Sequence, residues 1–165
     1  MISNMQVLSP MTYNNGKSVR DPTDVAILRE LSGNPRLGVS ELARRVGMSA
    51  PAVRERVQRL EDIGVIAGYR LEIDPKALGY GVMVFVRIRP NPGQLRMIAD
   101  IARELPNVVE CHRITGEDCF IVKAYLRDLD ELDGVLDRFL VYGHTTTSIA
   151  QSSPVPGRAL PLPGE

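Results

Sequence analysis

The sequence predicts an α+β fold, with an N-terminal winged helix-turn-helix followed by a C-terminal ferredoxin-like βαββαβ domain. Apolar residues first recur at helical spacing, and from Val82 they follow the alternation of a strand. The 165 residues suffice for two small domains, and a hydrophobic content of 44% allows each a core. We expect a flexible tail at 1–20, the winged helix at 21–75, a linker at 76–81, the sheet domain at 82–152 and a second tail at 153–165.

The first helix is expected to run from about Pro22 to Ser32. Asp21 suits its N-cap position, and Gly33-Asn34-Pro35 stops it. One side of this helix is apolar, with Val25, Ile27, Leu28 and Leu31.

Residues 38–60 have the pattern of two helices joined by a tight turn. Gly47 can take the left-handed conformation that ends a helix, and Ser49 is a good N-cap for the next one. Pro51 is tolerated in the first turn of that helix, where backbone N–H groups lack partners. The inward-facing residues then recur at i, i+4 and i+7 as Val53, Val57 and Leu60. This is the layout of a helix-turn-helix, whose second helix enters the DNA major groove.

The side chains on the outside of that second helix suit duplex DNA. Arg54 and Gln58 can make bidentate hydrogen bonds to guanine and adenine edges, and small residues near the helix start permit a close approach. Other arginines are better placed for phosphates, namely Arg44, Arg45, Arg56 and Arg59. The full candidate DNA-binding set is Arg44, Arg45, Ser49, Ala50, Ala52, Arg54, Glu55, Arg56, Gln58 and Arg59. The alternative is an ordinary surface hairpin with solvated arginines.

Charge is balanced overall and basic locally. The chain has 20 Lys+Arg and 20 Asp+Glu, whereas residues 36–60 hold six arginines and two glutamates. A local basic patch on a neutral protein suits a DNA-binding protein that must avoid non-specific binding. Aromatic residues make up only 5%, which argues against a single-strand binder built on stacking.

Residues 64–73 are expected to form the wing, a small hairpin with its turn at Ala67-Gly68. Asp74-Pro75 ends it, because the residue before a proline is pushed out of the helical region.

The second half predicts the element order β-α-β-β-α-β, which is the split βαβ arrangement. Its elements are expected as strand 82–89, helix 95–105, strands 108–115 and 119–126, helix 129–140 and strand 145–152. Such a sheet carries helices on one face, and the other face would expose Met83, Phe85 and Ile121. The simplest cover is a second copy of the chain in a two-fold dimer.

The turn at Gly116-Glu117-Asp118 is a candidate small-molecule site. Gly116 permits backbone N–H groups to converge on a carboxylate, and Glu117 or Asp118 could receive an ammonium. Thr145 and Thr146 could add hydroxyl groups. The alternatives are a simple hairpin turn and β-branched residues at a strand start.

Other chemistry finds no support in the sequence. We find no nucleotide-binding or hydrolase motif and no zinc spacing, so we expect no enzyme, cofactor or metal. Cys111 and Cys119 would lie three or four positions out of register on neighbouring strands, too far apart for a disulfide. Unpaired thiols, no membrane-length apolar run and no secretory signal together predict a cytoplasmic protein.

Several motifs together resemble the Lrp/AsnC, or feast/famine, class of transcriptional regulators over roughly residues 21–162. The matching stretches are Asp24-x-x-Ile27-Leu28, Glu41-Leu42-Ala43-x-x-Val46-Gly47-x-Ser49, Arg56-Val57-x-Arg59-Leu60-Glu61-x-x-Gly64-Val65-Ile66-x-Gly68-Tyr69, Asp74-Pro75-x-x-Leu78-Gly79, Thr115-Gly116-Glu117, Thr145-Thr146-Thr147-Ser148-Ile149 and Ala159-Leu160-Pro161-Leu162.

The resemblance implies a cytoplasmic, nucleoid-associated regulator whose C-terminal domain dimerises and senses a small molecule, usually an amino acid. Family dimers often assemble into tetramers or octamers, and the effector pocket usually lies between adjacent dimers near the turn that matches Gly116–Cys119. The candidate effector-binding residues are therefore Thr115, Gly116, Glu117, Asp118, Cys119, Thr145 and Thr146. Many members carry an Asp where this chain has Cys119, and an aromatic residue where it has Asp118, so the chemistry of the pocket is expected to differ from theirs.

The predicted function is a sequence-specific DNA-binding regulator modulated by a small-molecule effector, an amino acid by resemblance. One alternative is an amino-acid-binding ferredoxin-like module without DNA recognition. Another is an architectural DNA-compacting protein, which predicts no effector response.

Overall fold

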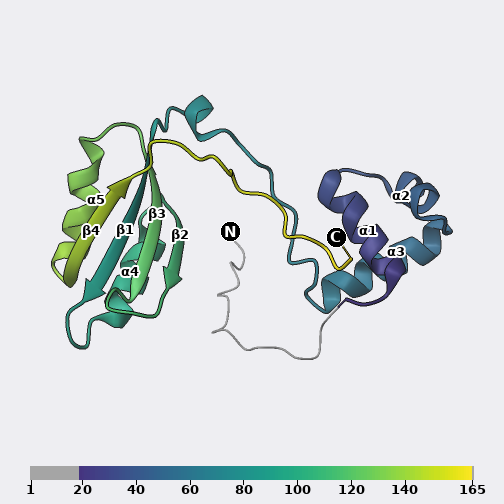
Figure 1. The fold of residues 1–165 in the computed structure, drawn as a ribbon, viewed down its shortest axis with the longest axis horizontal. Helices are drawn as coiled ribbons and strands as arrows, with labels where there is room; N and C mark the ends of the chain where they lie inside the picture. The colour runs from purple at the N-terminus through teal and green to yellow at the C-terminus, as the bar shows by residue number, and fades with distance from the viewer. Residues whose placement is uncertain (1–18, 165) are drawn as a thin grey trace. The chain divides into compact units, whose positions relative to one another are not determined.

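The computed structural model describes residues 19–164, which fall into two units (Figure 1). One unit is helical, ends at Leu71 and also holds the segment that begins at Gly157. The other, Glu72–Pro156, contains the sheet. The predicted N-terminal tail lies outside the described residues except for Val19 and Arg20.

The helical unit consists of α1 (Pro22–Gly33), α2 (Val39–Val46) and α3 (Ala50–Asp62). The Asp21 carboxylate accepts hydrogen bonds from the backbone N–H groups of Thr23 and Asp24, at 2.8 and 3.3 Å, which confirms its predicted N-cap role. Gly47 ends α2 in the left-handed conformation, with φ 68° and ψ 34°, as predicted. The three helices enclose a core of Ile27, Leu42, Ala43, Val53 and Leu60.

Residues 64–74 form neither helix nor strand, so the predicted wing hairpin at 64–73 is wrong. The backbone N–H groups of Val65 and Ile66 both donate to the Leu60 carbonyl, at 2.9 and 3.0 Å, and are used to close the end of α3. A two-residue hairpin turn favours positive φ at both central residues, which Ala67 does not readily adopt. Leu71 is consequently 84% exposed.

A short 3₁₀ helix, η1 (Pro75–Leu78), lies where the sequence predicted the winged helix to end and the linker to begin. The Asp74 side chain accepts a hydrogen bond from the Lys76 N–H at 2.9 Å, and Gly79 ends the turn with φ 85°. The chain therefore enters the sheet unit through a capped turn.

The sheet unit confirms the predicted β-α-β-β-α-β order. Its elements are β1 (Val82–Pro90), α4 (Leu95–Glu104), β2 (Val108–Arg113), β3 (Phe120–Leu126), α5 (Glu131–Leu140) and β4 (Gly143–Ile149). The four strands pair antiparallel in the order β2-β3-β1-β4 (Figure 1). The ferredoxin-like α+β fold predicted for this half is thus confirmed.

The last strand begins earlier than predicted, at Gly143 instead of Thr145. Gly143 pairs with Pro90, and a Cβ at Gly143 would lie 2.5 Å from the Arg89 carbonyl oxygen. Only glycine fits so close a backbone approach, so pairing starts before the β-branched residues that marked the strand in the sequence.

One face of the sheet carries both helices. Alternate residues of β1 and β3 point to this side, and Val84, Val86, Ile88, Val122, Ala124 and Leu126 are fully buried there. Ile98 of α4 and Phe139 of α5, also fully buried, belong to the same core. Residues of the opposite face, including Met83, Phe85 and Ile121, are half-buried.

Candidate functional site

The outer side of α3 presents most of the predicted base-reading residues. Arg54, Glu55 and Gln58 are exposed, and Ser49 occupies the N-cap position with an exposed side chain. Ala50 and Ala52 are both half-buried, and Ala50 packs against the helical core. The helix thus offers a narrow polar strip next to small side chains.

Arg54 and Gln58 differ in how they are held. Within residues 19–164, Arg54 makes no ion pair or hydrogen bond, so its guanidinium can turn to a ligand. The Gln58 side-chain amide donates to Asp62 Oδ1 at 3.0 Å, one helical turn later. A side-chain amide has two N–H donors and an acceptor oxygen, so this hydrogen bond orients Gln58 and still leaves one N–H and the oxygen for a base edge.

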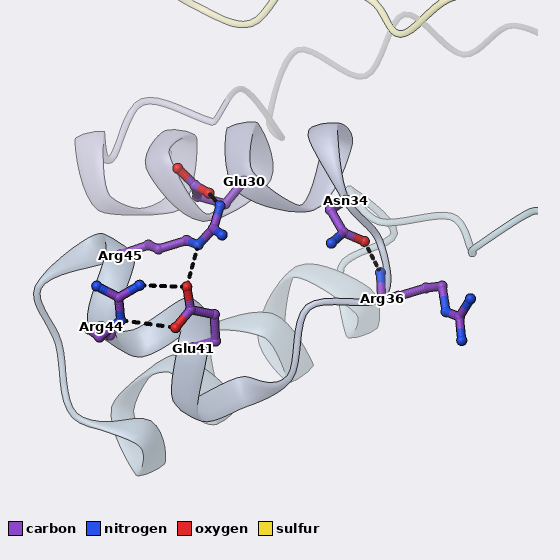
Figure 2. A network of polar contacts seen from close by, with 6 residues as sticks. All are labelled: Glu30, Asn34, Arg36, Glu41, Arg44 and Arg45. Atoms are coloured by element: carbon purple, nitrogen blue, oxygen red, sulfur yellow. Dashed lines mark hydrogen bonds and ion pairs between the residues drawn. The ribbon is translucent and has the colours of Figure 1, made fainter.

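The two arginines at the end of α2 form a network with glutamates (Figure 2). Arg44 makes two hydrogen bonds to the Glu41 carboxylate, at 2.9 and 2.7 Å. Arg45 donates to Glu41 at 2.8 Å and to Glu30 of α1 at 2.9 Å. Hydrogen bonds from Arg44 and then Arg45 lower the pKa of Glu41 to about 2.

A second ion-pair cluster joins α1 to α3. Arg56 Nη1 lies 2.9 Å from Asp21 Oδ2 and 2.8 Å from Asp24 Oδ1, and Arg59 Nη2 donates to Asp24 Oδ2. Asp24 is buried, with only 3% of its surface exposed. The Arg56 hydrogen bond, followed by that of the Thr23 N–H, lowers the pKa of Asp21 to about 2.

All four arginines predicted to hold phosphates are therefore already paired with carboxylates of the same unit. Asp21 and Asp24 were absent from the sequence-predicted site, because Asp24 and Arg56 are 32 residues apart and only tertiary packing brings them together. A shallow hollow of about 710 Å³ lies beside this cluster. It is lined by Asp21, Met48, Ala52, Glu55, Arg56, Gln58, Arg59 and Asp62.

The predicted effector turn lies between β2 and β3. The Ile114 N–H donates to the Cys119 carbonyl at 2.9 Å, the Cys119 N–H donates to the Ile88 carbonyl at 3.0 Å, and Gly116 has φ 106°. Thr115, Gly116 and Glu117 are exposed, whereas Cys119 packs against the sheet core. The turn is thus anchored at its base and open at its tip.

Two arginines of β1 that the sequence-predicted site omitted face the acidic residues of this turn. Arg89 forms an ion pair with Glu117, and Arg87 Nε lies 3.8 Å from Asp118 Oδ2. Both are exposed and lie on the sheet face opposite the helices. The alternating Val-Arg-Ile-Arg pattern at 86–89 was the available sequence signal.

Thr145 and Thr146 lie on opposite faces of β4. Thr146 pairs with Arg87 on the face that carries the two arginines, whereas Thr145 pairs with Ile88 on the helix side. Successive side chains of a strand alternate between faces. Only Thr146 therefore shares a face with Arg87 and Asp118.

Cys111 and Cys119 are both free thiols, as the sequence predicted. Cys111 pairs with Val122 on the neighbouring strand, three residues from Cys119. Among the residues that the structure describes, no helix is long and apolar enough to cross a membrane.

Comparison with known families matches both halves of the chain. Residues 20–67 match a winged helix-turn-helix DNA-binding family, and residues 83–160 match the Lrp/AsnC ligand binding domain. The chain is 33% identical over 129 residues to the HTH-type transcriptional regulator LrpC of Bacillus subtilis. The match spans 78% of this chain and 90% of that protein. It is 37% identical to the proline dehydrogenase transcriptional activator of Rhodobacter capsulatus, over 67% of this chain and 74% of the relative.

Solved structures agree with these matches. The structure of B. subtilis LrpC has a TM-score of 0.78 at 32% identity and covers 82% of this chain and 96% of that one. A feast or famine regulatory protein of M. tuberculosis, complexed with L-methionine, has a TM-score of 0.79 at 31% identity. That match covers 85% of this chain and 97% of the other. A Neisseria meningitidis transcriptional regulator in an L-methionine complex has a TM-score of 0.79 at 28% identity. It covers 87% of this chain and 97% of its own.

Proposed function

The chain belongs to the Lrp/AsnC family of transcriptional regulators, and we propose that it binds specific DNA sequences through α3 and that an amino acid bound to the sheet unit changes its effect on transcription. It would act in the cytoplasm, on the nucleoid. The observation that carries the DNA-binding part is the outer side of α3. There Arg54, which has no partner among residues 19–164, stands one turn before Gln58, beside small residues at the start of the helix.

Base reading is assigned to this strip because its geometry suits the major groove. Arg54 supplies a fork for a guanine edge, and Gln58 supplies an amide for an adenine edge. Arg44 and Arg45, at the end of α2, are the proposed phosphate contacts next to it. Their shared partner Glu41 is 36% exposed at its side chain, so the network lies open to solvent.

The test is a gel shift and an anisotropy titration against DNA upstream of the protein's own gene. The Arg54→Ala variant should lose about 1–3 kcal/mol of specific binding and relax the preference at one base pair. The matched control is Arg96→Ala, which removes an arginine 93% exposed at its side chain from α4 of the other unit and should leave DNA binding unchanged. Unaltered specificity in Arg54→Ala would remove α3 from the proposal.

The effector site is assigned to the β2–β3 turn and the β1 residues facing it. Arg87 and Arg89 could hold the carboxylate of an amino acid, while Glu117 and Asp118 could hold its ammonium. Thr146 would add a hydroxyl group from the same face. Two related regulators have been solved in complex with L-methionine, which supports an amino acid as the class of effector.

A calorimetric and thermal-shift panel of the common amino acids, L-methionine included, tests this assignment. The Arg87→Gln variant should weaken the best ligand at least tenfold, whereas Arg103→Gln, an exposed arginine of α4, should not. Ligand binding without DNA affinity in any condition would instead favour an amino-acid-binding module without DNA recognition.

A homodimer is proposed because the sheet face opposite the helices has half-buried apolar residues, including Met83, Phe85 and Ile121. Further assembly to tetramers or octamers would follow the pattern of the family. Light scattering should give at least twice the chain mass of 18.2 kDa, and footprints should show half-sites spaced by about 34 Å or multiples of it. A monodisperse monomer would contradict this part.

A further inference from the structure

Four charged side chains join the start of α1 to the middle of α3. Asp24 is buried, and its two carboxylate oxygens accept hydrogen bonds from different arginines, one from Arg56 at 2.8 Å and the other from Arg59. Arg56 also donates to Asp21 at 2.9 Å. Two guanidinium groups thus face two carboxylates, and the cluster is neutral as a whole.

The neighbouring arginine of α3 lies outside this cluster. Arg54 is exposed and, in the described part of the chain, has no carboxylate partner. Arg59 is also half-exposed, at 53% of its side chain, so exposure alone would make both available to DNA. What separates them is the buried carboxylate that Arg59 shares with Arg56.

We propose that Asp24 is a positioning residue of the DNA-binding surface, which holds Arg56 and Arg59 away from DNA phosphates and leaves Arg54 as the positive charge that α3 offers to DNA. The inference rests on the proposed DNA binding and specifies which of its arginines take part. It replaces the sequence-based expectation that Arg56 and Arg59 hold phosphates.

The physical reason is the cost of an uncompensated charge. The Asp24 side chain is only 5% exposed and has little access to water, so removing its arginine partners leaves a buried charge without compensation. A phosphate that attracts Arg59 must therefore compete with Asp24, whereas a phosphate or base edge that attracts Arg54 competes only with water. Keeping two arginines occupied also limits binding to arbitrary DNA, which is driven by phosphate neutralisation.

The salt dependence of DNA binding distinguishes these roles. Each phosphate neutralised on duplex DNA adds about 0.9 to the slope of log affinity against log salt. Arg44→Gln, which removes a proposed phosphate contact, should reduce the slope by about that amount, and Arg59→Gln should leave it unchanged. Arg54→Gln should instead relax the sequence preference. Arg59→Gln keeps the bond between Arg56 and Asp24, which allows the helical unit to stay folded.

Asp24→Asn removes the charge while keeping the size of the side chain. It should free Arg59 for phosphates, raise the slope by about 0.9 and increase the affinity for scrambled DNA. In the double variant Asp24→Asn with Arg59→Gln, the slope should return to the wild-type value. A residue with only a structural role would lower the melting temperature without producing this pattern.

The experiment measures anisotropy of the upstream duplex and a scrambled duplex of the same composition across a salt series, with circular dichroism to verify folding. If Asp24→Asn does not fold, the slopes of Arg44→Gln and Arg59→Gln decide. A slope reduced in Arg59→Gln as much as in Arg44→Gln would overturn the inference, as would an unchanged slope in folded Asp24→Asn. A wild-type chain that binds no duplex would overturn the proposed function itself.

Discussion

Asp21 and Glu41 each accept hydrogen bonds from arginines, and this sets how the helical unit responds to acid. The pKa of each carboxyl group is lowered to about 2, in both cases chiefly by an arginine hydrogen bond. A carboxyl group with a lower pKa in the folded than in the unfolded chain stabilises the fold above its unfolded pKa, and that stabilisation is lost as the pH falls through the folded value.

Acid should therefore weaken the helical unit between about pH 4.5 and pH 2. Urea unfolding followed by circular dichroism at several pH values measures this loss. Glu41→Gln should make the dependence shallower, because the variant no longer gains a proton on unfolding. The matched control is Glu55→Gln, an exposed glutamate of α3 without an ion pair in the described part of the chain, which should retain the wild-type dependence. If the stability of Glu41→Gln falls with pH as steeply as that of the wild type, Glu41 does not contribute to the acid sensitivity.

At the scale of elements, the placement of α3 depends on the turn before it and the cluster beside it. Gly47 reverses the chain with a positive φ of 68°, and the Met48 N–H then donates to the Ala43 carbonyl at 2.9 Å. The buried Val53 and Leu60 fix one side of α3 in the core. The angle at which α3 presents Arg54 therefore follows from a local turn and a few apolar contacts.

Gly47→Ala should destabilise the helical unit by about 1–2 kcal/mol, because a Cβ disfavours the left-handed conformation. Nothing lies within 4 Å of the added Cβ, so the cost would come from the backbone and not from a clash. Gly33→Ala is the control, since Gly33 ends α1 without positive φ and its Cβ also meets open space. Chemical denaturation compares the two, and an unaffected Gly47→Ala would show that the turn tolerates a side chain.

At the scale of the whole molecule, the part of the chain that the structure describes contains two separate hydrophobic cores. One is centred on Ile27 and Leu60 in the helical unit, and the other on Phe139 and Ile98 in the sheet unit. Each core is formed by residues of its own unit. Unfolding need not be a single transition in such a chain.

Phe139→Ala should destabilise the sheet unit by about 3–5 kcal/mol and leave the helical unit nearly unchanged. The adjacent Leu140→Ala, at a residue that is 50% exposed, should have a much smaller effect. Calorimetry combined with hydrogen exchange can assign each transition to a unit. A uniform loss of protection across both units would mean that they unfold together.

The order of helices and strands could be read from the sequence, because periodicity, caps and chain breakers act over a few residues. The Asp21 cap, the Gly47 turn and the alternation from Val82 to Ile88 are local features of this kind. The wing was predicted wrongly because two local patterns compete in that segment. Its alternating residues suggested a hairpin, but the chain closes the end of α3 with the Val65 and Ile66 N–H groups instead.

Local pattern by itself determined the α+β class, the element order, and which faces of α3 and β1 point outward. Tertiary structure alone decided which charges are free. Asp24 and Arg56 are brought together across 32 residues, and Arg89 and Glu117 across 28. The sequence shows that arginines are present, but only packing decides which guanidinium faces an exposed carboxylate, as in the Arg44–Glu41 pair, and which faces a buried one, as in the Arg59–Asp24 pair.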